Sequence, residues 1–211
     1  MTRKNSDPVA VIGAGGHAKV VISTLQASGQ AVGAVFDDDA RKWQTTILGV
    51  GVRGPISALM ETNYRAAIIT IGNNGVRERV SEQLKNLEWL TAIHPQAYVH
   101  PSAHIAGGTV IFAGAVIQPD VIIGSHVIVN TGATVDHDCV LGDYVHLAPG
   151  AHLAGGVKVG RGSFLGIGAV VTPYRVIGDW ATIGAGGVVV KDIADNVTAV
   201  GVPARPIKRD L

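Results

Sequence analysis

The chain has 211 residues, of which 47% are apolar and 16% are charged, and its formal net charge at pH 7 is +1. This composition indicates a globular protein of one large or two small domains. The near-neutral charge argues against a nucleic-acid partner, which would require a basic surface.

Three local features bear on location and redox chemistry. The polar, basic segment 1–8 is followed by a predicted strand and not by an apolar leader with a cleavage site, so we expect a cytoplasmic protein. The uncharged run 144–157 contains histidines, glycines and Pro149, and we expect no membrane span there. The single cysteine, Cys139, cannot form an internal disulfide, and we interpret it as a core residue.

The chain opens with a predicted strand, a glycine turn and a helix. The apolar run 9–12 predicts the strand, the residues from Gly13 to Ala18 form the turn, and helical periodicity continues to Gln26. A second strand, 31–36, ends in three aspartates about twenty residues beyond the glycines, where dinucleotide folds place an acid that binds ribose.

A third predicted strand, 66–71, is followed by Gly72-Asn73-Asn74-Gly75 and by a helix over 76–87. Three strands with two or three helices make a Rossmann-like half-domain of the α/β class. The glycine turn matches G-x-G-x-x-A, so an NAD-dependent enzyme is an alternative. Residues 8–93 lack the second mononucleotide half that would hold nicotinamide, and a nucleotide-linked sugar fits a half-site better.

The second part of the chain is a six-residue repeat. From Val99 to Ala194, sixteen consecutive hexads each open on an aliphatic residue, and a small or β-branched residue recurs four places later, with Arg175 as the exception. The openers are Val99, Ile105, Ile111, Ile117, Ile123, Val129, Val135, Leu141, Leu147, Leu153, Val159, Leu165, Val171, Ile177, Ile183 and Val189.

A period of six predicts a wall strand plus a corner, repeated around a triangular solenoid. Three hexads then close one coil, and each opener points inward and stacks on the opener 18 residues later, at about 4.8 Å. We expect Gly124, Gly142, Gly160 and Gly178 to lie at corners that need a positive φ. A purely structural solenoid is the alternative, but it has no use for a group of central histidines.

Histidines concentrate in the middle of the repeat, at His126, His137, His146 and His152. Imidazole, with a pKa near 6.5, suits the acceptance of a proton near neutral pH, and a neighbouring carboxylate such as Asp138 would orient it. Any one of these histidines could instead be a corner residue with a structural role. A metal site is the less favoured alternative, because no compact His/Cys/carboxylate set has tetrahedral spacing.

The hexads run without an inserted loop, so the acceptor must be held elsewhere, and the N-terminal domain is the available candidate. The segment 129–146, which reads VNTGATVDHDCVLGDYVH, closely resembles the hexapeptide-repeat sugar O- and N-acyltransferases related to sialic acid O-acetyltransferase. The Gly-Gly-His turn, the Asp37-Asp38 pair, the segment 71–74 and the segment 200–206 also match, so the resemblance covers the whole chain.

The resemblance implies a Rossmann-like nucleotide-sugar-binding domain over 1–93 and an all-β, left-handed parallel β-helix over 94–211, with a C-terminal tail. It also implies a homotrimer with acetyl-CoA between neighbouring β-helices and no metal. His137 becomes the general base and Asp138 its orienting acid. The remaining residues carried over are His146 near the acetyl thioester, Gly155, Ile167 and Ala185 along the CoA groove, Gly15, Gly16 and His17 at the sugar-nucleotide turn, and Asp37, Asp38 and Asn73 around the nucleotide.

The function we predict is acetyl-CoA-dependent N-acetylation of the 4-amino group of a nucleotide-linked 4-amino-4,6-dideoxyhexose, GDP-perosamine or a UDP-linked analogue, in surface-polysaccharide synthesis. Two alternatives remain open. The first is a sugar O-acetyltransferase of the sialic acid type, which would need a hydroxyl acceptor and no nucleotide. The second is a non-catalytic nucleotide-sugar-binding scaffold, which would not bind CoA.

Overall fold

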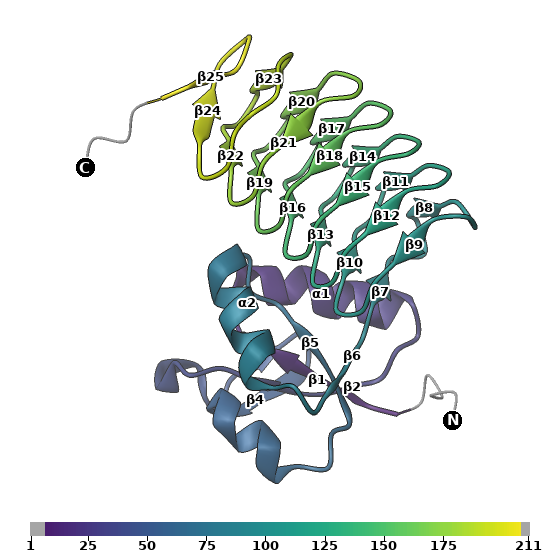
Figure 1. The fold of residues 1–211 in the computed structure, drawn as a ribbon. Helices are drawn as coiled ribbons and strands as arrows, with labels where there is room; N and C mark the ends of the chain where they lie inside the picture. Colours follow the sequence, from purple (N-terminus) through teal and green to yellow (C-terminus); the bar gives the residue numbers. More distant parts are fainter. Residues whose placement is uncertain (1–6, 208–211) are drawn as a thin grey trace.

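A computed structural model describes residues 7–207, so most of the polar segment 1–8 and the end of the predicted C-terminal tail lie outside the described residues (Figure 1). An α/β domain is followed by a parallel β-helix, as the sequence predicts. No helix within 7–207 is long and apolar enough to cross a membrane.

The α/β domain is built on a six-stranded sheet of order β3-β4-β2-β1-β5-β6, in which only β3 runs antiparallel to its neighbour. The three predicted strands are confirmed, whereas β3, β4 and β6 were not predicted because two of them have only two residues each. The elements are β1 (Val9–Ile12), α1 (Gly16–Ala27), β2 (Val32–Phe36), a 3-10 turn (Ala40–Lys42), β3 (Thr46–Ile47), β4 (Val50–Gly54), a second 3-10 turn (Ile56–Glu61), β5 (Ala66–Ile69), α2 (Asn74–Gln83) and β6 (Glu88–Trp89).

Helix α2 begins earlier than its periodicity predicts. The Oδ1 atom of Asn73 accepts a hydrogen bond from the Val76 N–H at 2.9 Å, and this N-cap starts the helix at Asn74. The preceding strand accordingly ends at Ile69, which leaves residues 70–73 as a loop at the carboxyl edge of the sheet. Ligands of open α/β sheets bind at this edge.

The β-helix has three walls, and strands 18 residues apart pair in parallel within each wall as far as β23. At the C-terminal end of wall 1, β24 pairs in parallel with β22 at a separation of 16 residues, and β25 pairs antiparallel with β24. Wall 1 contains β7 (Ala92–Ile93), β10 (Val110–Ile111), β13 (Ile128–Val129), β16 (His146–Leu147), β19 (Phe164–Leu165), β22 (Thr182–Ile183), β24 (Thr198–Val200) and β25 (Arg205–Pro206). Wall 2 contains β8 (Tyr98–Val99), β11 (Val116–Ile117), β14 (Thr134–Val135), β17 (His152–Leu153), β20 (Val170–Val171) and β23 (Val188–Val189). Wall 3 contains β9 (His104–Ile105), β12 (Ile122–Ile123), β15 (Val140–Leu141), β18 (Lys158–Val159) and β21 (Val176–Ile177).

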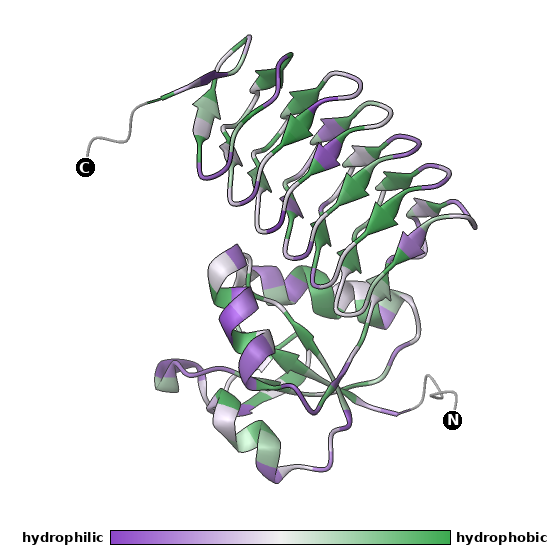
Figure 2. Ribbon diagram, in the orientation of Figure 1, coloured by the Kyte–Doolittle hydropathy of each residue, from purple (hydrophilic) through white to green (hydrophobic). Residues whose placement is uncertain are grey.

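The hexad register is confirmed. The openers from Ile111 to Val189 are buried and form one apolar core, which Figure 2 shows as a column of hydrophobic strands. The β-helix begins before the first predicted hexad at Val99, because β7 pairs with β10 as the first strand of wall 1. Arg175, the exception to the small-residue pattern, is half-buried at the surface, and its Nε donates to the Pro173 carbonyl at 3.1 Å.

The corner glycines are a correction. Positive φ recurs at every sixth residue from Gly108 to Gly186, and Gly124, Gly142, Gly160 and Gly178 do not have it. These four glycines are needed for a different reason, which is the close stacking of successive coils. A Cβ on Gly142, for example, would lie 2.7 Å from the backbone nitrogen of Arg161 in the next coil.

The α/β domain packs on wall 1, with α1 and α2 beneath the β-helix (Figure 1). Val110, Phe112 and Ile128 of wall 1 share one buried cluster with apolar residues of α1. We call the turns between wall 1 and wall 2 the 1–2 corner, those between wall 2 and wall 3 the 2–3 corner, and those between wall 3 and wall 1 the 3–1 corner. The 2–3 corner is opposite wall 1 in the triangular section, and the α/β domain leaves it uncovered.

Candidate functional site

A cavity of about 430 Å³ opens at the carboxyl edge of the α/β sheet. Its lining includes Gly15, Gly16, His17, Asp37 and Asp38, which the sequence assigned to the nucleotide sugar. Gly15 caps α1 without a side-chain hydrogen bond, so the first backbone N–H groups of this helix are free to bind an anion at the cavity.

The carboxylate of Asp37 forms hydrogen bonds to the loops around this cavity. Its Oδ2 atom accepts hydrogen bonds from the Ala14 N–H at 2.6 Å and from Lys42 Nζ at 3.0 Å, and its Oδ1 accepts from the Asp39 N–H at 2.8 Å. Burial alone would raise the pKa of Asp37, but the hydrogen bonds from Ala14, Asp39 and Lys42 hold it below its ordinary value. The structure thus gives Asp37 a role that its spacing did not indicate, which is to hold the glycine turn.

His17 lies between the cavity and wall 1. Its ring packs edge-to-face on Phe112, with 5.4 Å between ring centroids, and its Nε2 atom is buried without a hydrogen-bond partner. Burial, and secondarily the nearby Arg77 cation, lowers the pKa of His17 to about 4, so the imidazole is neutral at physiological pH. An unpaired polar atom beside a cavity is a position at which a ligand hydroxyl or phosphate could bind.

Arg77 is a buried cation at the interface of the two domains, and sequence reasoning missed it. Its Nε donates to the His126 carbonyl, its Nη1 to the Ile71 and Gly72 carbonyls, and its Nη2 to the Tyr144 carbonyl and Asn74 Oδ1, at 2.7 to 3.3 Å. All five guanidinium N–H groups are therefore used. Burial lowers the pKa of Arg77 to about 10, which leaves it charged at neutral pH.

His146 is also on the covered wall. Its Nδ1–H donates to the Gly72 carbonyl at 3.2 Å, and its Nε2 is 3.4 Å from the Asn130 amide nitrogen, which fixes a neutral tautomer. Burial, followed by Arg77, lowers the pKa of His146 to about 4. The rings of His146 and His17 lie 6.3 Å apart, so His146 belongs to the same side of the molecule as the first cavity.

A second cavity, of about 580 Å³, lies where the N-terminus of α2 meets the β-helix. Asn73 lines this cavity together with Phe164, Trp180 and Asn196, and not the first cavity, to which the sequence assigned it. Gly72 lines both, so the two cavities adjoin at the loop that Arg77 holds.

His137 lies on the 2–3 corner, where its imidazole is half-exposed. The Nδ1 atom is 2.7 Å from Asp138 Oδ2, and the backbone N–H of His137 donates to Asp136 Oδ1. The hydrogen bond to Asp138 is the main reason that the pKa of His137 is raised. This pair leaves Nε2 as the atom that can accept a proton.

Gly155 lies one coil beyond His137, as predicted, and the imidazole lies against it. A Cβ on Gly155 would be 2.5 Å from His137 Nε2, so only glycine permits this position of the ring. The Gly155 N–H donates to no acceptor within residues 7–207. Ile167 and Ala185 lie on the 1–2 corner of successive coils, and both are exposed.

The structure places most of the predicted site residues in two groups, while Asn73 lines the second cavity and Ile167 and Ala185 lie on the 1–2 corner. Gly15, Gly16, His17, Asp37 and Asp38 surround the first cavity, and His146 lies beside them on wall 1. His137, Asp138 and Gly155 lie on the opposite 2–3 corner of the same chain. The wall or corner on which a polar side chain lies therefore determines which of the two groups it joins.

The fold and these groups define the protein class, which is a hexapeptide-repeat acyltransferase with an N-terminal α/β domain. Residues 8–84 match the PglD N-terminal domain, and residues 120–155 match the bacterial transferase hexapeptide of six repeats.

Known proteins of this architecture are close relatives. PerB from Caulobacter crescentus, solved in complex with CoA and GDP-perosamine, has 44% sequence identity and a TM-score of 0.91, with 95% of this chain and 97% of that chain covered. The acetyltransferase domain of PglB from Neisseria gonorrhoeae FA1090, in complex with acetyl coenzyme A, has 40% identity and a TM-score of 0.90, with 95% and 99% covered.

Among curated sequences, UDP-N-acetylbacillosamine N-acetyltransferase from Bacillus subtilis (strain 168) is 43% identical over 113 residues, which are 47% of this chain and 49% of the relative. The chain matches less than half the length of the curated relatives. Since the PerB match spans nearly both whole chains, the chain belongs to the hexapeptide-repeat sugar N-acetyltransferase family with a PglD-type N-terminal domain.

Proposed function

We propose that this protein transfers the acetyl group of acetyl-CoA to the 4-amino group of a nucleotide-linked 4-amino-4,6-dideoxyhexose in surface-polysaccharide synthesis, in the cytoplasm. The observation that carries the proposal is the His137–Asp138 pair on an exposed corner of a hexapeptide β-helix. Among acceptors we favour GDP-perosamine, because PerB is solved with it and covers nearly the whole of this chain.

The first cavity is the proposed nucleotide-sugar site. Free N–H groups at the start of α1 suit the diphosphate, and Lys42 adds a cation to the lining. Asp38 and the unpaired Nε2 of His17 provide polar atoms for hydroxyl groups. The second cavity adjoins at Gly72, where Asn73 contributes further polar atoms.

The proposed reaction needs no acyl-enzyme. The sugar amine attacks the thioester carbonyl, a C–N bond forms, and His137 Nε2 accepts the proton that the nitrogen loses. The Gly155 N–H donates to the oxyanion of the tetrahedral intermediate. The C–S bond then breaks, and the CoA thiolate leaves with a proton from the imidazolium, so that the imidazole is neutral again. Asp138 keeps the tautomer in which Nε2 is the acceptor.

A single chain does not complete this site, because the cavities lie at wall 1 and His137 lies on the opposite corner. A neighbouring copy would have to present its His137 to the acceptor. The exposed apolar residues on walls 2 and 3, among them Tyr98, Ile122, Val170 and Val176, support contacts between copies. We propose a homotrimer in which acetyl-CoA lies between neighbouring β-helices, with Ile167 and Ala185 on one side of the groove.

The test is a screen of GDP-, UDP- and dTDP-linked 4-amino-4,6-dideoxyhexoses with acetyl-CoA, with release of free thiol as the readout. We expect the highest kcat/KM with the GDP-linked sugar. Acetylation of free sialic acid without a nucleotide would instead identify an O-acetyltransferase. His17→Ala should raise the KM for the acceptor and leave that for acetyl-CoA unchanged, whereas Lys19→Ala on the exposed face of α1 should change neither.

A further inference from the structure

Helix α2 is attached to the β-helix through backbone carbonyls of the 3–1 corner. His126, Tyr144 and Gly162 occupy the same position of this corner in three successive coils, and their φ values are 56°, 59° and 68°. None of these three carbonyls accepts a backbone N–H within residues 7–207. The repeat therefore leaves one carbonyl per coil without a partner on this corner, and a carbonyl that a docked helix covers needs a donor.

Two side chains of α2 supply these donors. Arg77 Nε donates to the His126 carbonyl at 2.8 Å, and its Nη2 donates to the Tyr144 carbonyl at 2.7 Å. Asn74 Nδ2 donates to the Gly162 carbonyl at 2.9 Å. Successive coils are about 4.8 Å apart, and the forked guanidinium of Arg77 reaches two of them at once, which a single ammonium does not.

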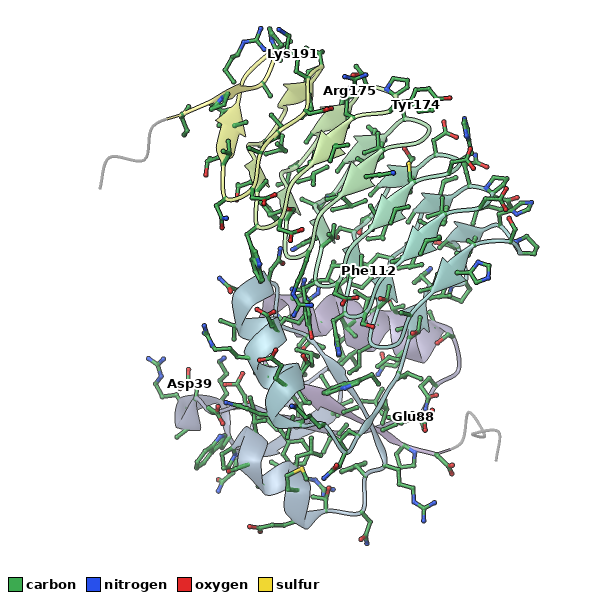
Figure 3. All side chains as sticks on the ribbon, in the orientation of Figure 1. Asp39, Glu88, Phe112, Tyr174, Arg175 and Lys191 are labelled. Carbon is green, nitrogen blue, oxygen red and sulfur yellow. The ribbon has the colours of Figure 1, made fainter. Side chains whose placement is uncertain are left out.

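The same guanidinium holds the loop that the two cavities share. Its Nη1 donates to the Ile71 and Gly72 carbonyls at 3.0 and 3.3 Å, and His146 of wall 1 donates to the same Gly72 carbonyl. Gly72 lines both cavities. Figure 3 shows Phe112 of wall 1 at this junction of the two domains. One rigid, buried group thus joins the acceptor loop to two coils of the β-helix.

The two coils that Arg77 joins are those on either side of the proposed base. His137 lies between His126 and Tyr144 in the chain, so its level along the β-helix axis falls between the levels of the two carbonyls. In the proposed homotrimer the β-helices lie side by side, and cyclic symmetry includes no translation along its axis. The His137 of a neighbouring copy therefore lies at the level at which Arg77 holds the acceptor loop.

We propose that Arg77 is a positioning residue for acetyl transfer, which sets the level of the acceptor loop on the β-helix so that the sugar amine meets the base of the neighbouring copy. Arg77 lines neither cavity, so it acts through the loop and not on the substrates. The role rests on the proposed function and adds to it a residue on which the rate depends. A displacement of about 1 Å between reacting groups can lower a rate about 10²-fold.

The experiment measures rate and binding separately in Arg77→Met. With GDP-perosamine and acetyl-CoA, kcat should fall about 10- to 100-fold at a temperature at which circular dichroism shows the variant to be folded. The KM for acetyl-CoA and the calorimetric Kd for GDP should both stay within about twofold of the wild-type values. GDP is the probe because its diphosphate is assigned to the start of α1, away from the loop that Arg77 holds.

A matched variant controls for stability. Ile177 is 1% exposed in the core beneath wall 3, and Ile177→Ala should destabilise the protein through its cavity. Under the same folded conditions its kcat should remain near the wild-type value.

Two further variants separate the charge of Arg77 from its reach. Arg77→Lys keeps the cation but cannot bind two coils and the loop together, so its kcat should also be low. Asn74→Ala removes the contact with the third coil and leaves Arg77 in place, and it should lower kcat by a smaller factor with an unchanged Kd for GDP. This variant tests the same docking if the Arg77 variants do not fold.

An equal fall of kcat in Ile177→Ala would make the effect one of general stability and overturn the positioning role. Wild-type kcat in Arg77→Lys, or in Asn74→Ala where only that variant folds, would overturn it as well, and so would a loss in Arg77→Met that is confined to GDP affinity. Wild-type protein that acetylates no nucleotide-linked amino sugar would instead remove the proposed function, and this role with it.

Discussion

The histidines of wall 1 and of the 2–3 corner occupy the same repeat but have opposite properties. His146 is covered by the α/β domain, and burial beside Arg77 lowers its pKa to about 4. His137 is half-exposed, and the Asp138 carboxylate raises its pKa. His146 lies in a wall strand that the α/β domain covers, and His137 lies in a corner turn that is free of it, so the difference follows from the position of each side chain in the coil and from what covers it. A covered histidine serves as a neutral hydrogen-bonding group, whereas an exposed one beside a carboxylate can move a proton.

The largest effect is expected from removing the exposed histidine. His137→Ala should lower kcat by about 10²- to 10⁴-fold, the usual contribution of a positioned general base. Asp138→Ala should lower it less, because the carboxylate orients the imidazole and does not transfer the proton. Steady-state kinetics at saturating substrates measures both. CoA affinity and oligomer mass serve as controls, and retention of more than half the activity would exclude His137 as the base.

Substitutions on the side of the β-helix that the α/β domain covers should change the free energy of unfolding. Arg77→Met leaves four carbonyls and the Asn74 amide without their donor, and should lower the free energy of unfolding by about 3 to 5 kcal/mol. Denaturant titration measures this loss. Arg79→Met, on the exposed face of the same helix, is the matched control and should change stability little. Equal losses in both variants would contradict the role of Arg77 in joining the domains.

Acidification should destabilise the same covered side. His17, His126 and His146 have pKa values lowered to about 4 in the folded protein, whereas the unfolded chain titrates near 6.5. The unfolded state therefore binds more protons between these values, and the free energy of unfolding should fall as pH falls from about 6.5 to about 4, by up to about 3 kcal/mol for His146. His146→Asn should show a shallower fall in pH-dependent denaturation, and an equal slope would refute the assignment.

A smaller effect tests the support beneath His137. Gly155→Ala adds a Cβ where the imidazole lies, so the ring must move, and kcat should fall about tenfold with an unchanged KM for the acceptor. Gly51→Ala, where a Cβ meets nothing within 4 Å, is the matched control. Full activity of Gly155→Ala would show that the ring position is not critical.

The pH dependence of kcat/KM tests the role of the His137–Asp138 pair. Because the pKa of His137 is raised, kcat/KM should rise with pH through an apparent value above the ordinary 6.5 of imidazole. Asp138→Asn removes the carboxylate and should move this rise to lower pH. A profile unchanged by Asp138→Asn would assign the titration to the substrate amine.

The hexad pattern was sufficient to predict the β-helix, because each coil contacts the next at a fixed separation of 18 residues. The inward position of Leu141, the corner position of His137 and its neighbour Gly155 all followed from this register. The glycine turn likewise predicted β1 and α1. Periodicity did not distinguish glycines that need positive φ from those, such as Gly142, whose Cβ would meet the next coil.

Only the tertiary structure decided which histidines are covered. Asn74 donates to the carbonyls of Gly162 and Ser163, and Arg161 pairs with Glu78, across more than 80 residues of sequence. No local pattern encodes such docking contacts, because they depend on how two separately folded surfaces meet. The same docking made Arg77 a buried cation, turned His146 toward Gly72 and left His137 on the free corner. The sequence by itself determined the register of each side chain in its coil, and the docking of the α/β domain on wall 1 determined its electrostatic environment.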